Sequence, residues 1–393
     1  MTKVSRVIIT TMYINDYRVP FFNRLRELLA DKGVELQLLA GKPSTEEAKK
    51  KDQASPGWEI SIPCRYFFKG RVCWFPFGAY AKKADLTIVT QENKLIYNLW
   101  LLSAGRPKRI AFWGHGGNLQ AKKPNGFKER FKSWTINKVD WWFAYTEMSA
   151  GLVRKAGFPP ERTTVVNNAV DTGNLAALCK QVRSDDCRRM RQQLGLTEGP
   201  VGLYLGSLQK SKRLDFFLDA VERIHEQVRT FQLVIVGAGP DQAQIETAAR
   251  RHAWIHYPGP LHGLDKAKVL MLSDVLLNPG MVGLGILDSF VSGTPLFTTE
   301  CGIHSPEIAY LESGMNGVST ADDVEAYSDA VISALMDPQT LSSLRVGALA
   351  SAGSYSIERM AQRFSAGICA CLSSRENTGS HIAETKVESV QIK

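Results

Sequence analysis

Short apolar runs alternate with longer amphipathic segments along the whole 393-residue chain. The apolar runs that read as buried strands are 6–12, 34–40, 86–90, 109–113 and 141–145 in the first half, and 201–205, 233–236, 254–257, 275–277 and 295–298 in the second. Segment 19–32 is predicted to be a helix, because Pro20 lies near its start and Gly33 follows its end. Strands spaced so widely require crossover helices, so each series predicts a parallel sheet in an α/β protein.

The two series of strands predict two domains. The polar segment 194–200 (LGLTEGP) separates them, which predicts a first domain over 1–194 and a second over 195–355. A chain of this length is sufficient for two or three domains with their own cores. Residues 373–393 are polar and lack periodicity, so they are predicted to be a disordered tail.

The second half contains a glycine-rich turn between a buried strand and a helix, NPGMVGLGILD (278–288). The helix is predicted to open near Gly283, and Gly280 and Gly283 allow a ligand to approach the backbone closely. A helix start offers unpaired N–H groups and a positive dipole end, which is typical of a phosphate site. Asp288 is expected about one and a half turns into the helix, within reach of a ribose if phosphates lie at the helix start.

A second strand-to-helix connection lies upstream in VGLYLGSLQKSKRLDFF (201–217). The strand ends at Gly206, and the polar loop that follows carries Lys210, Lys212 and Arg213. Cations at the carboxyl end of a strand lie where an open α/β sheet binds its ligand. Taken alone, this segment slightly favours an ordinary solvated basic loop over a ligand site.

Together the two connections resemble the nucleotide-sugar half of the family 4 retaining glycosyltransferases. The shared patterns are strand–Gly–x–Leu–x–x–x–Lys before a helix, and Gly–x4–Asp–x4–Gly–x–Pro from Gly283 to Pro295. The resemblance covers most of residues 6–364 and implies the GT-B fold, in which two Rossmann-like parallel-sheet domains face a cleft. It also implies that helix 356–372 crosses back to the first domain.

The resemblance implies roles for individual residues. Lys212 would bind the donor diphosphate and act in catalysis, and Asp288 would hold the ribose where the family usually has Glu. The other residues expected at the donor site are Gly206, Ser207, Arg213, Gly280, Met281, Val282, Gly283 and Glu307.

Two positions depart from the family pattern. Ser207 replaces an Arg that binds the diphosphate, and Lys210 or Arg213 is the candidate substitute. Gly280 replaces the first Glu of the family's E-x7-E motif, with Glu307 or His304 as the candidate substitute.

Two turns of the first half are expected to face the same cleft. In AFWGHGGN (111–118), His115 lies among glycines at the end of a strand. Similar glycosyltransferases have a His here that contacts the donor sugar near the reacting centre, and an ordinary turn histidine is the alternative. Asn15, Asp16 and Arg18 follow the first strand and are candidates for acceptor or phosphate contact, against an ordinary helix-start loop.

A third glycine motif, VIVGAGPD (234–241), begins like a dinucleotide fingerprint. Its third glycine position is occupied by Gln242, and a partial match of this kind is weak evidence for a nucleotide site. We interpret it as the turn that follows a strand.

Charge is distributed unevenly along the chain, whose net charge is +9. Residues 1–195 contain 33 Lys+Arg and 17 Asp+Glu, and segment 106–138 contains nine cations and one acid, with tryptophans in or beside it. A solvated face, nucleic acid, anionic lipid and a pyrophosphate-bearing acceptor all fit such a patch. Because no nucleic-acid motif is present, the interleaved aromatic residues favour an anionic membrane surface over nucleic acid.

Cysteine usage and hydropathy bear on the compartment. The seven cysteines form no CxxC motif, which favours reduced thiols in the cytoplasm, and no apolar run approaches the length of a membrane span. We therefore expect a cytoplasmic protein, peripheral on the inner face of the cell membrane. No DxD or zinc-type spacing is present, so neither a metal nor a cofactor is expected.

The sequence thus predicts a retaining, metal-independent glycosyltransferase. The expected donor is a nucleotide sugar, with UDP favoured over GDP, and the expected acceptor is a glycan or lipid-linked glycan in polysaccharide biosynthesis. Two alternatives remain open. A GT-B nucleotide-sugar epimerase would share both phosphate elements, and a non-catalytic nucleotide- or carbohydrate-binding module would fit the departures at Ser207 and Gly280.

Overall fold

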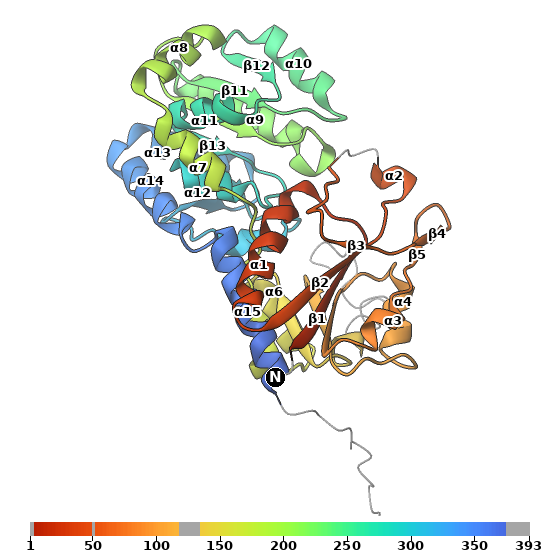
Figure 1. The fold of residues 1–393 in the computed structure, drawn as a ribbon. Helices are drawn as coiled ribbons and strands as arrows, with labels where there is room; N and C mark the ends of the chain where they lie inside the picture. The colour runs from red at the N-terminus through yellow and green to blue at the C-terminus, as the bar shows by residue number, and fades with distance from the viewer. Residues whose placement is uncertain (1–3, 49–51, 118–133, 375–393) are drawn as a thin grey trace, which may run out of the picture.

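The computed structural model describes residues 4–48, 52–117 and 134–374. These residues form two domains, each built on a parallel sheet flanked by helices (Figure 1). The predicted α/β architecture with two parallel sheets is therefore confirmed. Most of the predicted tail, 375–393, lies outside the described residues, as does 118–133 with Lys122, Lys123, Lys128 and Arg130 of the basic segment.

The first sheet has the strand order β3-β2-β1-β6-β7-β8-β9, and every neighbouring pair is parallel. Its strands are β1 (Ser5–Thr11), β2 (Val34–Ala40), β3 (Ile60–Ser61), β6 (Leu86–Thr90), β7 (Ile110–Gly114), β8 (Trp141–Ala144) and β9 (Thr163–Val165). Val7 and Ile9 of β1 belong to one apolar core, and Ile8 between them belongs to another. Both faces of the sheet are thus covered, as a parallel sheet requires.

The second sheet has the order β12-β11-β10-β13-β14-β15 and is also parallel throughout. Its strands are β10 (Val201–Leu205), β11 (Gln232–Val236), β12 (Ile255–Gly259), β13 (Val275–Leu277), β14 (Leu296–Thr299) and β15 (Gly317–Thr320). The helices around it are α9 (Leu214–Gln227), α10 (Gln242–Arg251), α11 (Gly263–Leu272), α12 (Ile286–Ser292), α13 (Val324–Met336) and α14 (Pro338–Ala352). Its four inner strands are almost wholly buried, whereas the edge strands β12 and β15 are partly exposed.

The last helix, α15 (Ile357–Ser373), packs on the first domain rather than the second (Figure 1). It lies against α1 (Val19–Ala30), β8 and β9. Phe364 stacks on Phe143 of β8 with ring centroids 4.2 Å apart, and it meets Phe21 of α1 edge-on. The aromatic contacts explain why this helix is apolar along one face.

The structure corrects the predicted domain boundary. Helices α7 (Gly173–Gln181) and α8 (Ser184–Leu194) lie within 1–194 but pack against α11 and α12 of the second domain. The side chains that these two helices bury are Leu175, Cys179 and Met190. The chain therefore passes between domains after β9, and the polar segment 194–200 is only the turn from α8 into β10.

Shorter elements complete the first domain. They are η1 (Asp16–Arg18), α2 (Thr45–Ala48), α3 (Gly78–Ala81), α4 (Ile96–Leu101), α6 (Glu147–Lys155) and η2 (Pro160–Arg162). An antiparallel hairpin of β4 (Arg65–Phe67) and β5 (Val72–Trp74) lies apart from the main sheet. The second domain adds η3 (Lys210–Lys212) and η4 (Pro306–Tyr310).

Candidate functional site

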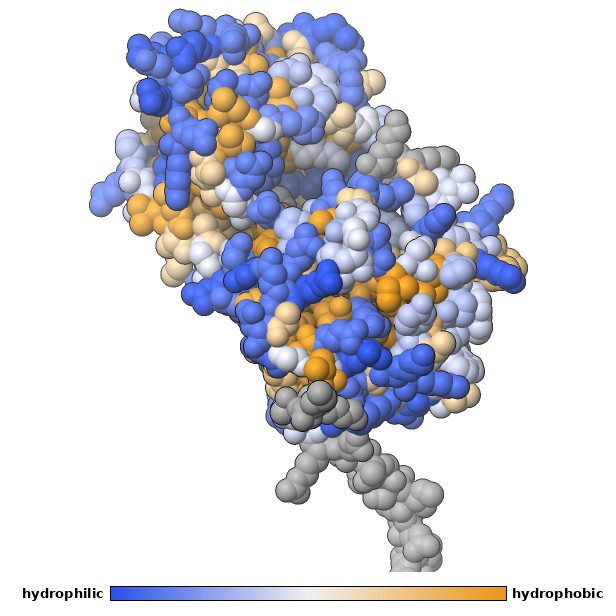
Figure 2. Space-filling view, in the orientation of Figure 1, coloured by the Kyte–Doolittle hydropathy of each residue, from blue (hydrophilic) through white to orange (hydrophobic). Residues whose placement is uncertain are grey.

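The strand order of each sheet contains a point where the direction of winding reverses. In the first sheet it lies between β1 and β6, and in the second between β10 and β13. Open α/β sheets bind ligands outside the carboxyl ends of the strands at such points. The surface is hollowed between the two domains (Figure 2), and the loops after these strands carry the residues selected from the sequence.

In the second domain, the loops after β10 and β13 are in direct contact. Met281 N–H donates to the Ser211 carbonyl at 2.9 Å, and the Lys212 ammonium donates to the Met281 carbonyl. Gly280 lies so close to Lys212 that a Cβ atom there would be 2.5 Å from the Lys212 carbonyl carbon. The glycine at 280 thus allows the two loops to form one surface, which explains physically why no carboxylate occupies this position.

The turn after β11 supports the same loop from the other side. Leu208 N–H donates to the Ala238 carbonyl, and a Cβ atom on Gly239 would lie 2.1 Å from the Leu208 carbonyl oxygen. A Cβ atom on Gly237 would lie 1.8 Å from the Gly206 carbonyl oxygen. The glycines of VIVGAGPD therefore serve close packing between loops, in agreement with the interpretation of this motif as a turn.

Lys212 is a buried cation whose side chain is 9% exposed. Burial lowers its pKa to about 8, although Cys301 acts in the opposite direction. No carboxylate among the described residues lies within ion-pair distance of its ammonium group. Nearby, Ser211 Oγ and Asn278 Oδ1 are buried and have no hydrogen-bond partner in the described part of the chain. The joined surface of the two loops thus carries a desolvated cation and polar atoms without partners in the described chain, as an anion site does.

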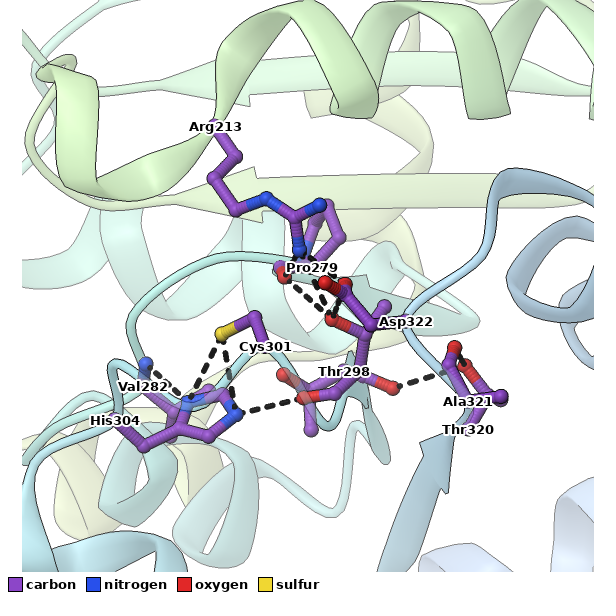
Figure 3. A network of polar contacts seen from close by, with 10 residues as sticks. Arg213, Pro279, Val282, Thr298, Cys301, His304, Thr320, Ala321 and Asp322 are labelled. Atoms are coloured by element: carbon purple, nitrogen blue, oxygen red, sulfur yellow. Dashed lines mark hydrogen bonds and ion pairs between the residues drawn. The ribbon is translucent and has the colours of Figure 1, made fainter.

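Arg213 is held in an ion pair instead of being free (Figure 3). Its guanidinium contacts the Asp322 carboxylate and lies 3.3 Å from Thr299 Oγ1. Burial would raise the pKa of Asp322, but hydrogen bonds from Arg213 and Thr299 lower it. Of the two candidate substitutes for the missing cation at Ser207, Arg213 is therefore engaged, whereas Lys210 is exposed and forms no ion pair with any described residue.

His304 braces the glycine-rich turn. Its Nδ1 accepts from Val282 N–H at 3.1 Å, and its Nε2 lies 2.7 Å from the Thr299 carbonyl. Figure 3 shows the His304 ring beside Val282. These contacts select the tautomer with the proton on Nε2, because Nδ1 is the acceptor. Both ring nitrogens thus contact backbone groups, one in the glycine-rich turn and one at the end of β14, which argues against a role of His304 in replacing the family's Glu.

The helix start and Asp288 differ from the sequence prediction. Helix α12 begins at Ile286, so Asp288 lies in its first turn and not one and a half turns along it. Gly283–Gly285 form a turn before the helix, in which glycine-rich backbone precedes the first i→i+4 hydrogen bond. The Asp288 carboxylate pairs with Lys266 of α11 at 2.9 Å; burial raises its pKa and Lys266 opposes this.

We expect Asp288→Ala to weaken UDP binding about tenfold or more, because a charged hydrogen bond to the ribose would be lost. Asp288→Asn should weaken it less, since an amide still bonds to hydroxyls. Calorimetry with UDP and GDP measures the effect. Lys266→Gln is the matched control, because it breaks the ion pair and leaves the carboxylate. Equal losses in the control and in Asp288→Ala would mean that Asp288 acts through the ion pair alone.

In the first domain, Arg18 is the principal charged residue at the carboxyl edge. It is 7% exposed, its guanidinium lies over the rings of Trp113 and Tyr145 at 5.1 and 5.7 Å, and it contacts Met360 Sδ. No described carboxylate lies within ion-pair distance of it. Asn15 instead donates to Asp52 at 3.1 Å, and Asp16 is exposed at the start of η1. Of these three candidates, only Arg18 presents a buried charge.

His115 lies exposed at the end of β7, with its ring edge-on to Tyr145 at 4.5 Å. Burial raises the pKa of Tyr145 to about 12, with Arg18 acting to lower it and Glu307 acting to raise it. His115, Tyr145 and Arg18 thus form one cluster on the first-domain side of the cleft.

Glu307 joins the two domains. It is 3% exposed in η4 and accepts from Asn168 Nδ2 at 2.6 Å, while Tyr310 Oη donates to the Asn168 carbonyl at 2.9 Å.

Five residues of the site were not predicted from the sequence: Asn168, Tyr145, Gln91, Thr299 and Asp322. Gln91 directly follows β6 at the reversal point, and its side-chain amide atoms are buried without partners in the described chain. The position of Gln91 directly after a strand is the one feature of the sequence that could have indicated a site residue. None of the five residues belongs to a sequence motif.

Among the described residues, no cluster of His, Cys, Asp and Glu has the geometry to hold a metal ion. Within the same ranges, no helix combines the length and apolar character needed to cross a bilayer.

Comparison with protein-family models gives two matches that together span most of the chain. Residues 21–174 match the model "Glycosyltransferase Family 4", and residues 199–337 match "Glycosyl transferases group 1". A similar characterised protein is the 2-deoxystreptamine glucosyltransferase of Streptomyces kanamyceticus, 25% identical over 54% of this chain. The matched part spans only 59% of that enzyme's length.

Solved structures with the same fold include Anabaena HepE in complex with UDP. It has a TM-score of 0.68 at 14% identity, over 93% of this chain and 99% of that one. A putative UDP-N-acetylglucosamine 2-epimerase from Listeria monocytogenes has a TM-score of 0.59 at 16% identity, over the full length of both chains. Identities this low indicate a shared fold only.

Proposed function

The chain belongs to the family 4 glycosyltransferases with the GT-B fold, and from this premise we propose that it transfers a sugar from a nucleoside diphosphate to a glycan or lipid-linked acceptor. The observation that carries the proposal is the joined surface of the β10 and β13 loops around Lys212. The cluster of His115, Tyr145 and Arg18 at the carboxyl edge of the first sheet adds to it. UDP is the favoured nucleotide, since the HepE structure contains it.

The proposed donor site places the diphosphate against Lys212. A buried ammonium of lowered pKa is poorly solvated, so a dianionic ligand restores its charge and gains strong attraction in return. When the glycosidic bond to the diphosphate breaks, negative charge grows on the departing phosphate oxygen. Lys212 stabilises that charge, with exposed Lys210 as the second cation and the amides of Gly283 and Leu284 as donors.

The proposed mechanism retains the configuration of the sugar and requires no metal ion. No side chain is assigned as a covalent nucleophile, so the acceptor hydroxyl attacks on the face from which the diphosphate leaves. The leaving phosphate takes the hydroxyl proton. The proposal assigns His115 to hydrogen-bond the sugar hydroxyls from the first-domain side, and its exposure at the end of β7 supports this role. Glu307 fixes the relative position of the domains through Asn168.

The proposed acceptor site includes Arg18 and selects an acceptor that carries a phosphate or a carboxylate. Burial of a guanidinium without a carboxylate partner is costly, and a bound anion would offset that cost. The guanidinium lies over the rings of Trp113 and Tyr145, and a guanidinium can bind a phosphate or a carboxylate through two N–H groups.

We expect Arg18→Met to abolish the stabilisation of the UDP-saturated protein by inorganic phosphate while UDP affinity is unchanged. The reason is that methionine fills the same space between the rings without offering N–H donors. The measurement is the melting temperature in saturating UDP with and without phosphate. Arg18→Lys is the matched variant, because it keeps the positive charge and loses the paired N–H donors of the guanidinium. Phosphate stabilisation that survives in Arg18→Met would place the anion elsewhere.

Incubation with several nucleotide sugars separates the proposed function from its alternatives. Transfer or slow hydrolysis of a UDP-sugar supports a glycosyltransferase. Isomerisation of the nucleotide sugar alone would support an epimerase, and binding without turnover would support a non-catalytic module. Peripheral attachment to the inner face of the cell membrane remains part of the proposal, and the basic segment 106–138 supports it by its composition.

A further inference from the structure

The β4–β5 hairpin exposes two adjacent aromatic rings at its tip. It is an antiparallel pair, Arg65–Phe67 with Val72–Trp74, at the outer edge of the first domain (Figure 1). Phe67 is 46% exposed and Phe68 is 77% exposed. Phe68 has the largest exposed fraction among the large hydrophobic residues of the described chain, so packing within the domain does not account for it.

The backbone at the tip makes the choice of phenylalanine more costly. Phe68 has φ 52° and Lys69 has φ 55°, both in the left-handed region that bulky side chains disfavour. Gly or Asn would form the same turn with less strain. An exposed ring gains nothing from burial in return, so the stability of the hairpin does not explain this residue.

All the charges that the hairpin itself carries are positive, and Glu47 of the neighbouring α2 is paired with Lys94. Residues 60–84 contain five cations and no acid. Arg65, Lys69 and Arg71 are exposed and form no ion pair with any described residue. By contrast, Arg106 pairs with Asp140 and Lys108 with Asp85 in the described part of the basic segment. Where the hairpin lies, Figure 2 shows hydrophobic surface next to strongly hydrophilic surface.

We propose that this hairpin docks on an anionic lipid bilayer. The rings of Phe67 and Phe68 enter the boundary between headgroups and acyl chains, and Arg65, Lys69 and Arg71 contact the lipid phosphates. Insertion removes the exposed aromatic surface from water, which compensates for the strained turn. The proposal does not depend on the sugar-transfer reaction, and it names an element separate from segment 118–133.

The position of the hairpin gives docking a consequence for substrate access. A cavity of about 540 Å³ lies between the hairpin and α2, lined by Pro43, Ser44, Thr45, Tyr66, Lys69 and Gly70. Helix α2 follows β2, so this cavity lies beside the carboxyl edge of the first sheet. Docking would bring that edge to the membrane, where an acceptor anchored in lipid is presented; this last step rests on the proposed function.

The test is co-sedimentation of the full-length protein with vesicles of phosphatidylcholine, or of equimolar phosphatidylcholine and phosphatidylglycerol, at low and high salt. The aromatic variant is Phe67→Thr with Phe68→Asn, since threonine suits a strand and asparagine tolerates the left-handed turn. The charge variant is Arg65→Ser, Lys69→Asn and Arg71→Ser. Matched controls in the second domain are Val346→Thr, which is 65% exposed on α14, and Lys180→Ser on α7.

We expect wild-type protein to bind the acidic vesicles, and both control variants to bind equally well. The aromatic variant should bind about tenfold more weakly or worse at either salt concentration. The charge variant should lose about fivefold per cation at low salt and less at high salt. The melting temperature of each hairpin variant should stay at or above that of wild type, which shows that the fold is intact. Absence of wild-type binding would overturn the proposal. So would hairpin variants that bind normally while Ser substitutions at Lys122, Lys123, Lys128 and Arg130 abolish binding.

Discussion

Lys212→Ala should lower the rate of sugar transfer by one to three orders of magnitude. The loss corresponds to roughly 2–4 kcal/mol of electrostatic stabilisation of the leaving diphosphate. The effect should appear in kcat as well as in kcat/KM, because charge on the leaving oxygen is greatest in the transition state. Steady-state and single-turnover kinetics with a UDP-sugar measure it. Lys180→Ala, an exposed lysine of α7, is the control for a general change of charge.

Lys212 should also make both the stability of the protein and its activity depend on pH. Its folded-state pKa of about 8 lies below the ordinary 10.5, so the unfolded chain binds more protons between these values. Stability should therefore rise with pH across that window, and Lys212→Met should remove the rise. Activity should respond in the opposite direction, since kcat/KM should fall above about pH 8 as free enzyme loses the charge. A profile that stays flat to pH 10, or near-normal turnover in Lys212→Ala, would remove Lys212 from the diphosphate site.

Gly280→Ala should impair both stability and activity. A Cβ atom at this position would lie 2.5 Å from the Lys212 carbonyl carbon and oxygen, so one of the two loops has to move. We expect a loss of about 1–3 kcal/mol in the free energy of unfolding. We also expect at least about a tenfold loss in kcat/KM, because small displacements of a positioning loop are expensive in catalysis. Thermal melts and steady-state kinetics measure the two effects.

Gly285→Ala is the matched control. Gly285 lies in the same glycine-rich turn, and a Cβ atom on it would have no neighbouring atom within 4 Å. Its stability and activity should remain near those of wild type. Gly280→Glu, which introduces the carboxylate usual in the family, should be worse than Gly280→Ala. A gain of activity in Gly280→Glu would show that the close contact between the loops does not govern this position.

The parts of the fold that the sequence predicted are those with long apolar runs. Strand β10 and helix α1 were located within two residues of their observed bounds, because each has a continuous apolar pattern and α1 has terminal signals. Strands β3 and β9 were missed; they have two and three residues, and none of these residues is fully buried. The boundary after residue 194 was wrong because a polar, glycine-containing turn also occurs between a helix and a strand of one domain.

The candidate site was predictable only as far as it follows local pattern. Lys212 and Gly280 were selected from their own motifs, yet their contact joins residues 68 positions apart and appears only in the folded chain. The pairing of Arg213 with Asp322, and of Asp288 with Lys266, likewise depends on which helices become neighbours. These ion pairs determine which cations remain available to bind a ligand, and they cannot be predicted from the spacing of residues along the chain.

The return of α15 to the first domain makes that domain discontinuous. Its sheet is complete by Val165, but Phe364, which stacks on Phe143 of that sheet, is about 200 residues later. During synthesis the second domain is therefore finished before the first receives its last helix. The first domain is therefore the last to complete its fold, because α15 is synthesised after the second domain. Until α15 packs, the apolar surfaces of β8 and α1 that it covers are exposed to water and to other chains.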